Sequence, residues 1–167
     1  RKADVHHPSY IQIILASPWY RSQTRTITYR KTTPFVCTKK LVDALIDKEL
    51  DHVLHNEEGS FGSFGKESVI VEKQLSLINL IGYSTNTPYR NRAQSIELFL
   101  TITIAPKPIL DRFTDTIRRA YGTRKIGYTT SPFTTFVVIR DHMQSVQEEC
   151  VVIDVGEEVT DVAFIKD

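Results

Sequence analysis

Apolar and polar residues alternate most regularly between Ile96 and Ile104. Isoleucine or leucine occupies every even position of this stretch, and Glu, Phe or Thr occupies the odd positions between them. A period of two predicts a β-strand with one buried face. A second apolar run, 69–83, precedes it across the turn-like sequence 84–88, and we expect the two runs to pair antiparallel as a central ribbon. On one side of the earlier strand we expect the aliphatic residues Val69, Val71, Leu75, Leu77 and Ile81.

Two other segments place apolar residues at helical spacing. The first begins after Thr38, whose side-chain oxygen can accept a hydrogen bond from the first turn of a helix. The second runs from Ile109 to Tyr121 and stops at Gly122, a residue type that often ends helices. The apolar positions of the first helix are Leu41, Val42, Leu45, Ile46, Val53 and Leu54.

Shorter segments complete the predicted fold. The pattern indicates strands at 10–16 and 125–129, and a third strand at 23–31 whose charged residues suit the edge of a sheet. The segment 131–142 is ambiguous, because its Thr, Val and Ile residues favour a strand by propensity. From Gln23 onward, the order of elements predicts an α+β fold, with one small antiparallel or mixed sheet that carries two helices on one face.

The last part of the chain has the pattern of a β-hairpin. Two β-branched runs, 151–155 and 159–165, flank the Gly-Glu-Glu turn 156–158. Such a hairpin brings Asp154, Asp161 and the amides of the turn to one edge, where they can hold a phosphate or a magnesium ion. A purely structural hairpin explains the same residues, and both interpretations stay open on the pattern alone.

Composition and charge narrow the classes of function. The 167 residues are 41% hydrophobic and 25% charged, with a formal net charge of +1. Without a basic block there is no electrostatic reason to expect nucleic-acid binding. No apolar run approaches the roughly 20 residues that span a bilayer, so we expect a soluble, cytoplasmic protein without a transmembrane segment. Cys37 and Cys150 do not suggest a disulfide framework.

The segment 56–66 is the clearest loop, with three glycines and two serines. It also carries Phe61 and Phe64, and aromatic side chains in a loop are favourable only where they dock against something. They can cover the core of their own domain, which we take as the default. The alternative hypothesis is that they form a tip that binds a partner.

The run 152–163, VIDVGEEVTDVA, resembles the second phosphate-binding motif of the actin-like ATPases, as found in the bacterial cell-division protein FtsA and the type IV pilus protein PilM. In those families the motif reads roughly aspartate, aliphatic, three glycines, two threonines, aspartate. The order of elements before it resembles the same proteins. The motif positions that match are Asp154, Gly156, Thr160 and Asp161, and those that differ are Glu157, Glu158 and Val159.

The resemblance implies a division of the chain. Residues 1–20 would end one actin-like, ribonuclease H-like lobe. Residues 21–130 would form the interaction domain called SHS2 or 1C, which is inserted in that fold. Residues 131–167 would start the second lobe with a helix, at 131–142, and the phosphate hairpin. The first phosphate motif, the adenosine motif and the later lobe would then lie outside this chain.

The resemblance also implies a function and a site. Such relatives act as scaffolds that bind protein partners or self-associate at the inner face of the cytoplasmic membrane, and a longer parent protein could bind ATP and magnesium. Asp154 would hold the magnesium shell, the Gly156 amide and Thr160 would touch phosphate, and Asp161 would brace the turn. The adjacent carboxylates of the turn 157–158, about 4 Å apart, repel by roughly 4 kcal/mol near a protein surface. We therefore expect this chain neither to bind ATP tightly nor to hydrolyse it.

Two other functions remain open. The chain could be half of an active actin-like ATPase or a sugar-kinase relative, with the remaining motifs elsewhere in its parent. It could also be an unrelated α+β binding module with a similar hairpin. The sequence contains no nucleophile elbow, Walker loop or zinc-ligand spacing that would indicate another kind of catalysis.

Overall fold

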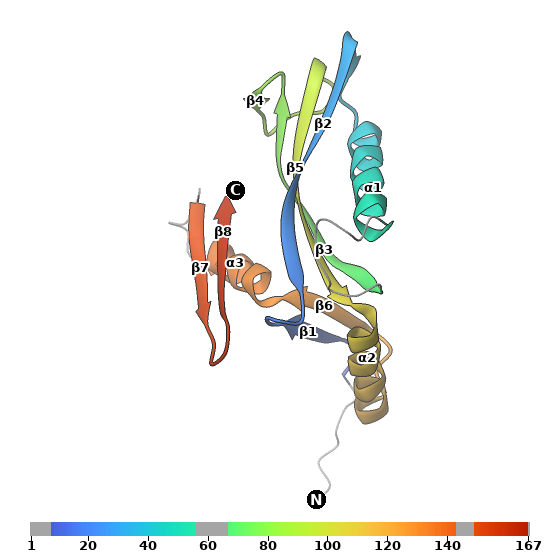
Figure 1. The fold of residues 1–167 in the computed structure, drawn as a ribbon, viewed down its shortest axis with the longest axis vertical. Coiled ribbons are helices and arrows are strands. Elements are labelled where there is room, and N and C mark those ends of the chain that lie inside the picture. Colours follow the sequence, from blue (N-terminus) through green and yellow to red (C-terminus); the bar gives the residue numbers. More distant parts are fainter. Residues whose placement is uncertain (1–7, 56–66, 143–148, 167) are drawn as a thin grey trace, which may run out of the picture.

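The computed structural model describes residues 8–55, 67–142 and 149–166. These residues form three helices and eight strands, and the fold is α+β as predicted. Figure 1 shows a long twisted sheet flanked by the helix α1. The strands β1 and β6 lie side by side at the lower end of this sheet. The hairpin of β7 and β8 lies beside the sheet together with α3.

The central sheet has four antiparallel strands in the order β2-β5-β3-β4. In the middle strand, β5, the even-numbered side chains from Ile96 to Ile104 are at most 5% exposed, which confirms the predicted alternation. The pairing of β3 with β5 confirms the central ribbon, and the edge position of β2 is confirmed as well. The strands span Arg21–Val36 (β2), Ser68–Leu80 (β3), Tyr83–Ser84 (β4) and Arg92–Pro106 (β5).

The helix α1, Lys39–His55, packs its apolar side on the buried face of β5. Leu41 donates its backbone N–H to Oγ1 of Thr38 at 3.2 Å, which confirms the predicted cap. An ion pair of 3.1 Å between Arg25 of β2 and Glu49 also joins the helix to the sheet. Each aliphatic side chain buried in this core contributes roughly 1.5–3 kcal/mol. The helix supplies Val42, Ile46, Leu50 and Val53 to it.

Two β-bulges change which side of β3 faces α1. The pairing with β5 shifts between Ile70 and Glu72 and again between Leu75 and Leu77. Because each bulge adds one residue to β3, the alternation of side chains reverses at both points. Lys73 and Leu75 therefore lie on the α1 side, whereas Leu77 lies on the opposite face. The prediction of one shared side for Val69, Val71, Leu75 and Leu77 is wrong for this reason. Ile81, which we expected on the same side, lies after the end of β3 at Leu80 and has a positive φ of 52°.

The strands β1, Ile11–Leu15, and β6, Ile126–Thr130, form a separate parallel pair. Our expectation that the strand near 125–129 joins the main sheet is therefore wrong. Parallel neighbours cannot be joined by a tight turn and need a crossover connection. Here that connection consists of β2, α1, β3, β4, β5 and α2, which we call the inserted unit.

The helix α2, Lys107–Tyr121, ends at Gly122 in the left-handed conformation, at a φ of 67°, as predicted. Its Leu110 belongs to a second core cluster between the inserted unit and the β1–β6 pair. Tyr128 of β6 donates its hydroxyl to the Leu110 carbonyl at 2.7 Å. The helix therefore fixes the inserted unit to the parallel pair. The buried members of this cluster are Leu15, Tyr20, Ala105 and Leu110.

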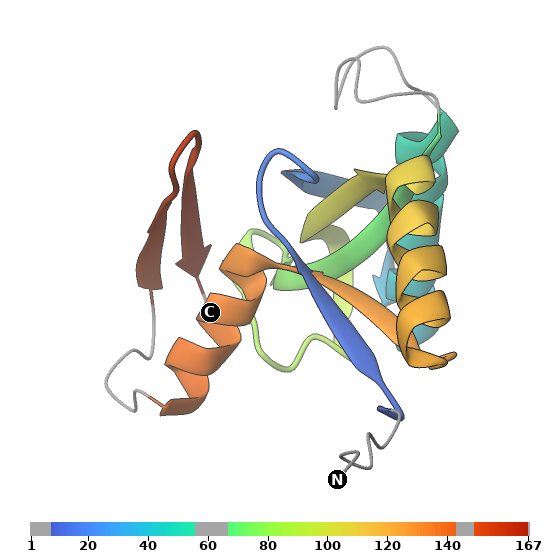
Figure 2. The ribbon, with the colours of Figure 1, turned by 90° about the horizontal axis from the view of Figure 1, so that it is seen from below.

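The helix α3, Ser131–His142, follows β6 directly. This confirms the helix implied by the resemblance, against the strand favoured by propensity. The strands β7, Glu149–Val155, and β8, Thr160–Lys166, form the predicted antiparallel hairpin. Figure 2 shows the hairpin and α3 on one side of the sheet, and α1 and α2 on the other.

Candidate functional site

The hairpin places its two aspartates directly opposite one another. Asp154 of β7 pairs with Asp161 of β8, and Val155 pairs with Thr160. Opposed residues of an antiparallel pair point to the same face, and successive residues along a strand point to opposite faces. The two carboxylates therefore share one face of the hairpin, and Thr160 lies on the other face.

The carboxylate of Asp161 contacts the loop that connects β1 to β2. It accepts hydrogen bonds from the Ser17 hydroxyl, from the Ser17 backbone N–H at 3.4 Å and from the Tyr20 hydroxyl at 3.3 Å. All three contacts are partly buried, and hydrogen bonds to an ionised carboxylate are stronger than those between neutral groups. Asp161 therefore joins β8 to the segment that leads into the inserted unit.

Tyr20 directly precedes β2 and is 9% exposed. Burial and, next, the negative charge of Asp161 raise the pKa of its hydroxyl to about 12. Both causes disfavour the phenolate. Tyr20 therefore keeps its proton, and with it the bond to Asp161, well into the alkaline range.

Asp154 is held by the first residue of α3. The Ser131 hydroxyl donates a hydrogen bond of 3.1 Å to its carboxylate. Leu15 and Thr130 are paired at the carboxyl ends of β1 and β6, so the segments after both strands leave the same edge of the parallel pair. Ligands of α/β proteins often bind at such an edge. The residues gathered there, which we call the hydroxyl–carboxylate cluster, are Ser17, Tyr20, Ser131, Asp154 and Asp161.

A third carboxylate ties the main sheet to the same edge. Glu72 of β3 accepts hydrogen bonds from the Thr129 hydroxyl, from the Thr130 backbone N–H at 2.8 Å and from the Thr130 hydroxyl at 2.8 Å. The first bulge of β3 makes this contact possible, because Glu72 is directed away from α1. The inserted unit and the β6–α3 boundary are therefore joined by a polar contact as well as by the second core cluster.

The turn of the hairpin is closed by Gly156, which donates its backbone N–H to the Val159 carbonyl at 3.0 Å. A Cβ atom at position 156 would lie 2.8 Å from that same oxygen, so the turn requires glycine. The side chains of Glu157 and Glu158 are exposed. The Gly156 amide is thus used inside the turn and is not presented to a ligand.

The opposite face of the hairpin is apolar and open. Ile153, Val155 and Phe164 are 61%, 76% and 65% exposed. Contiguous exposed apolar side chains are typical of surfaces that pack against another structure. The register places five of them together: Val151, Ile153, Val155, Val162 and Phe164.

The cluster fits a nucleotide site only in part. Asp154 and Asp161 supply carboxylate oxygens of the kind that magnesium prefers, and hydroxyls such as that of Ser131 could donate to phosphate. Asp161, however, already accepts three hydrogen bonds from Ser17 and Tyr20. Within the described ranges, no group of three or more His, Cys, Asp or Glu side chains is placed to hold a metal ion. A ligand would have to displace bonds that the chain makes to itself.

The sequence indicated Asp154 and Asp161 but not the groups that bind them. The three successive hydroxyl residues at 129–131, at the end of a predicted strand, were the available signal for one side of the cluster. Ser17 and Tyr20 gave no signal, because a loop far away in the sequence supplies them. Phe61 and Phe64, the predicted partner-binding residues, lie outside the described residues.

Comparisons with known proteins give no family for this chain. No protein-family model matches it, and neither does any curated protein sequence. In the part of the chain that the structure describes, no helix combines the length and the hydrophobicity needed to cross a membrane.

Proposed function

We propose that this chain is part of an actin-related scaffold protein of the FtsA or PilM type, with a role in cell division or type IV pilus assembly. In this proposal the inserted unit makes the protein–protein contacts. The strands β1 and β6, the helix α3 and the hairpin belong to the actin-like lobes. The protein acts in the cytoplasm, at the inner face of the membrane, which it reaches through its partners or other parts of its parent.

The observation that carries the proposal is the insertion. The chain leaves β1, forms a complete four-stranded unit with two helices, and returns in β6 beside β1. It then continues as helix and hairpin, which is the order that the resemblance implies. A generic α+β binding module gives no reason for a unit of this size to interrupt a parallel pair.

The open apolar face of the hairpin supports the same proposal. A two-stranded ribbon is marginal on its own and needs further strands or a helix against its apolar face. A sheet buries its apolar face against helices or a second sheet, so in an actin-like lobe the apolar face of this hairpin would be covered. The exposure of Val155 and Phe164 agrees with a hairpin built for such a lobe.

We further propose that the nucleotide site is degenerate. The Gly156 amide, the Thr160 side chain and the two aspartates do not converge on one point, and the acidic turn repels phosphate. Calorimetry with ATP and magnesium is expected to show no binding in the micromolar range. Micromolar affinity would instead favour the second candidate, half of an active actin-like ATPase, for which the opposed carboxylates of Asp154 and Asp161 are the favourable observation.

A pull-down experiment tests the scaffold proposal and separates its two versions. The immobilised chain is offered the C-terminal tail of FtsZ and, separately, a PilN-like cytoplasmic peptide, each with a scrambled peptide of the same composition as control. Selective capture of the first supports a role in cell division, and selective capture of the second a role in pilus assembly. Failure to retain either peptide above its scrambled control would contradict the scaffold proposal.

A further inference from the structure

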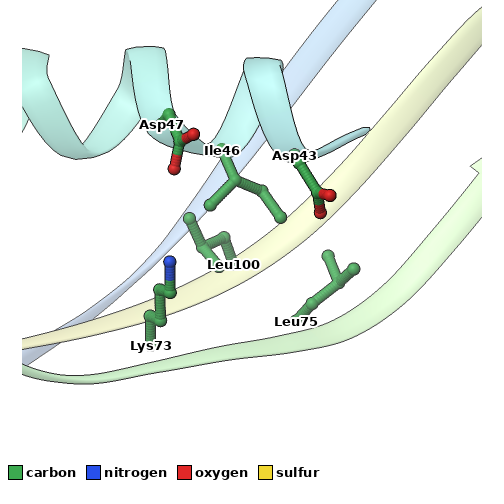
Figure 3. A pocket seen from close by; sticks show the side chains of 6 residues that line it. All are labelled: Asp43, Ile46, Asp47, Lys73, Leu75 and Leu100. Carbon is green, nitrogen blue, oxygen red and sulfur yellow. The ribbon is translucent and has the colours of Figure 1, made fainter. Parts of the chain in front are cut away.

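A groove lies between α1 and β3, on the face of the sheet that points away from the hairpin. It encloses about 470 Å³. In Figure 3 the carboxylates of α1 are directed toward β3, and the amine of Lys73 is directed back toward α1. The six residues that line this α1–β3 groove are Asp43, Ile46, Asp47, Lys73, Leu75 and Leu100.

The groove is acidic along one wall and apolar at its base. Asp43 and Asp47 are one helical turn apart, so they project from the same side of α1. Neither of them, nor Lys73, forms an ion pair with another described residue. Two carboxylates against one ammonium group leave an excess of negative charge, which favours a basic guest over an acidic one.

The two bulges of β3 build the sheet side of this groove. They bracket the short stretch 72–75 and turn Lys73 and Leu75 toward α1. Without the bulges, the alternation of the rest of the strand would place both side chains on the opposite face. Bulges that re-aim side chains are common beside functional sites.

The strand that borders the groove also has an open edge. Between Lys73 and Leu77, β3 pairs with β5 on one side, and no strand of the described ranges pairs with it on the other. The short strand β4 reaches only Asn79 and Leu80. An open strand edge can bind an extended peptide by adding it as a further strand, and side pockets then select its side chains.

We propose that an extended segment of a partner protein adds to this edge of β3 and inserts an arginine or lysine side chain between Asp43 and Asp47. The aliphatic stem of that side chain packs on Leu75 and the apolar base, while its charged end reaches the carboxylates. Main-chain hydrogen bonds to β3 supply affinity, and the acidic wall supplies the selection for a basic residue. This inference rests on the proposed scaffold function and defines the chemistry of the segment that the inserted unit recognises.

A peptide titration followed by NMR tests the groove directly. The isotope-labelled chain is titrated with the acetylated, amidated pentapeptide Thr-Val-Arg-Val-Thr and with the same peptide carrying glutamate in place of arginine. We expect the arginine peptide to shift the amide signals of 73–77 and of the α1 turn 43–47, and the glutamate peptide to bind at least about tenfold more weakly. Equal binding of the two peptides, or shifts confined to other elements, would overturn the inference.

A charge-matched pair of variants gives the control. Asp43→Asn combined with Asp47→Asn is expected to lower the affinity for the arginine peptide by about tenfold or more. Asp111→Asn combined with Asp115→Asn removes two carboxylates at the same spacing from α2 and is expected to leave the affinity unchanged. An equal loss in both double variants would show a general charge effect and would also overturn the inference.

The same variants separate this inference from the proposed function. If the unmodified chain captures the FtsZ tail or the PilN-like peptide and the Asp43/Asp47 double variant does not, both stand. If the unmodified chain and the Asp43/Asp47 double variant capture the physiological peptide equally, and the arginine peptide fails to bind, the groove inference is wrong while the scaffold function stands. If the arginine peptide binds in the groove but neither physiological peptide is captured, the groove inference stands and the choice of scaffold family is wrong.

Discussion

The carboxylate of Asp161 lies within hydrogen-bonding distance of both the backbone N–H and the hydroxyl of Ser17, although 144 positions separate the two residues. The hydroxyl of Tyr20 reaches the same carboxylate. The hairpin is therefore held against the β1–β2 loop by one side chain of β8. A substitution that removes this carboxylate therefore removes a contact with the segment that leads into the inserted unit.

Replacement of Asp161 by asparagine is expected to loosen this contact. The variant loses the charge that strengthens three hydrogen bonds and places an amide donor beside groups that are themselves donors. We expect the free energy of unfolding, measured by urea titration, to fall by about 1–3 kcal/mol.

Asp154 provides the matched control for that experiment, because it occupies the opposing position in the same hairpin. It is exposed and accepts one hydrogen bond, from Ser131 at 3.1 Å. Asp154→Asn is expected to change stability by less than about 0.5 kcal/mol, as is usual for a surface substitution. A larger loss in Asp154→Asn than in Asp161→Asn would contradict the assignment of the main contact to Asp161.

The raised pKa of Tyr20 predicts a loss of stability at high pH. Its pKa is about 12 in the folded protein, against an ordinary value of 10.0 in the unfolded chain. Between these values the unfolded chain releases the proton and the folded protein retains it, so stability is intact below pH 10 and declines toward pH 12. The decline should be shallower in Tyr20→Phe, measured as unfolding free energy against pH. Parallel curves for the two proteins would refute the prediction.

Glu72 is expected to contribute to stability through its contacts with the β6–α3 boundary. Glu72→Ala leaves the part-buried N–H of Thr130 and two hydroxyls without their acceptor, at a cost of about 1–3 kcal/mol. Glu72→Gln retains one acceptor and should fall between the alanine variant and the parent protein. As control, Glu97→Ala removes a carboxylate of the same sheet face, whose ion pair with Arg30 is 3.7 Å long and more exposed. We expect the denaturation midpoint to be highest in the parent protein, lower in Glu72→Gln and lowest in Glu72→Ala.

The turn of the hairpin should not accept a side chain at position 156. Gly156→Ala places a methyl group 2.8 Å from the Val159 carbonyl oxygen, and relief of such a contact costs about 1–3 kcal/mol. Hydrogen exchange is expected to accelerate for the amides of β7 and β8 while those of β5 keep their protection. Glu157→Ala, in the same exposed turn, should leave the exchange of both strands unchanged.

The sequence predicted those elements whose signal is local. The alternation from Ile96 to Ile104, the cap at Thr38 and the stop at Gly122 each depend on a few neighbouring residues, and the structure confirms all three. The helix 131–142 was correct only through the resemblance, because its β-branched residues favour a strand by themselves. Packing of α3 against β6 and the hairpin outweighs that propensity.

The sequence could not predict features that depend on distant parts of the chain. The bulges near Val71 and Ser76 have no glycine or proline to mark them, so the reversal of faces in β3 was missed. The same holds for the parallel partner of β6 and for the bonds from Ser17 and Tyr20 to Asp161, which join opposite ends of the sequence. The hairpin pattern therefore predicted Asp154 and Asp161 of the cluster, whereas Ser17, Tyr20 and Ser131 joined it only in the folded structure.

The location of β6 so far along the chain has a consequence for the order of folding. β1 emerges before β6 during synthesis, yet it can pair with β6 only after the whole inserted unit has been made. Closing a loop of this length is entropically costly while the intervening chain is extended, and the cost falls once that chain is compact. We therefore expect nucleation within the antiparallel sheet, and the pairing of β1 with β6 as a later step. The segment that interrupts the parallel pair is the one that makes its assembly feasible.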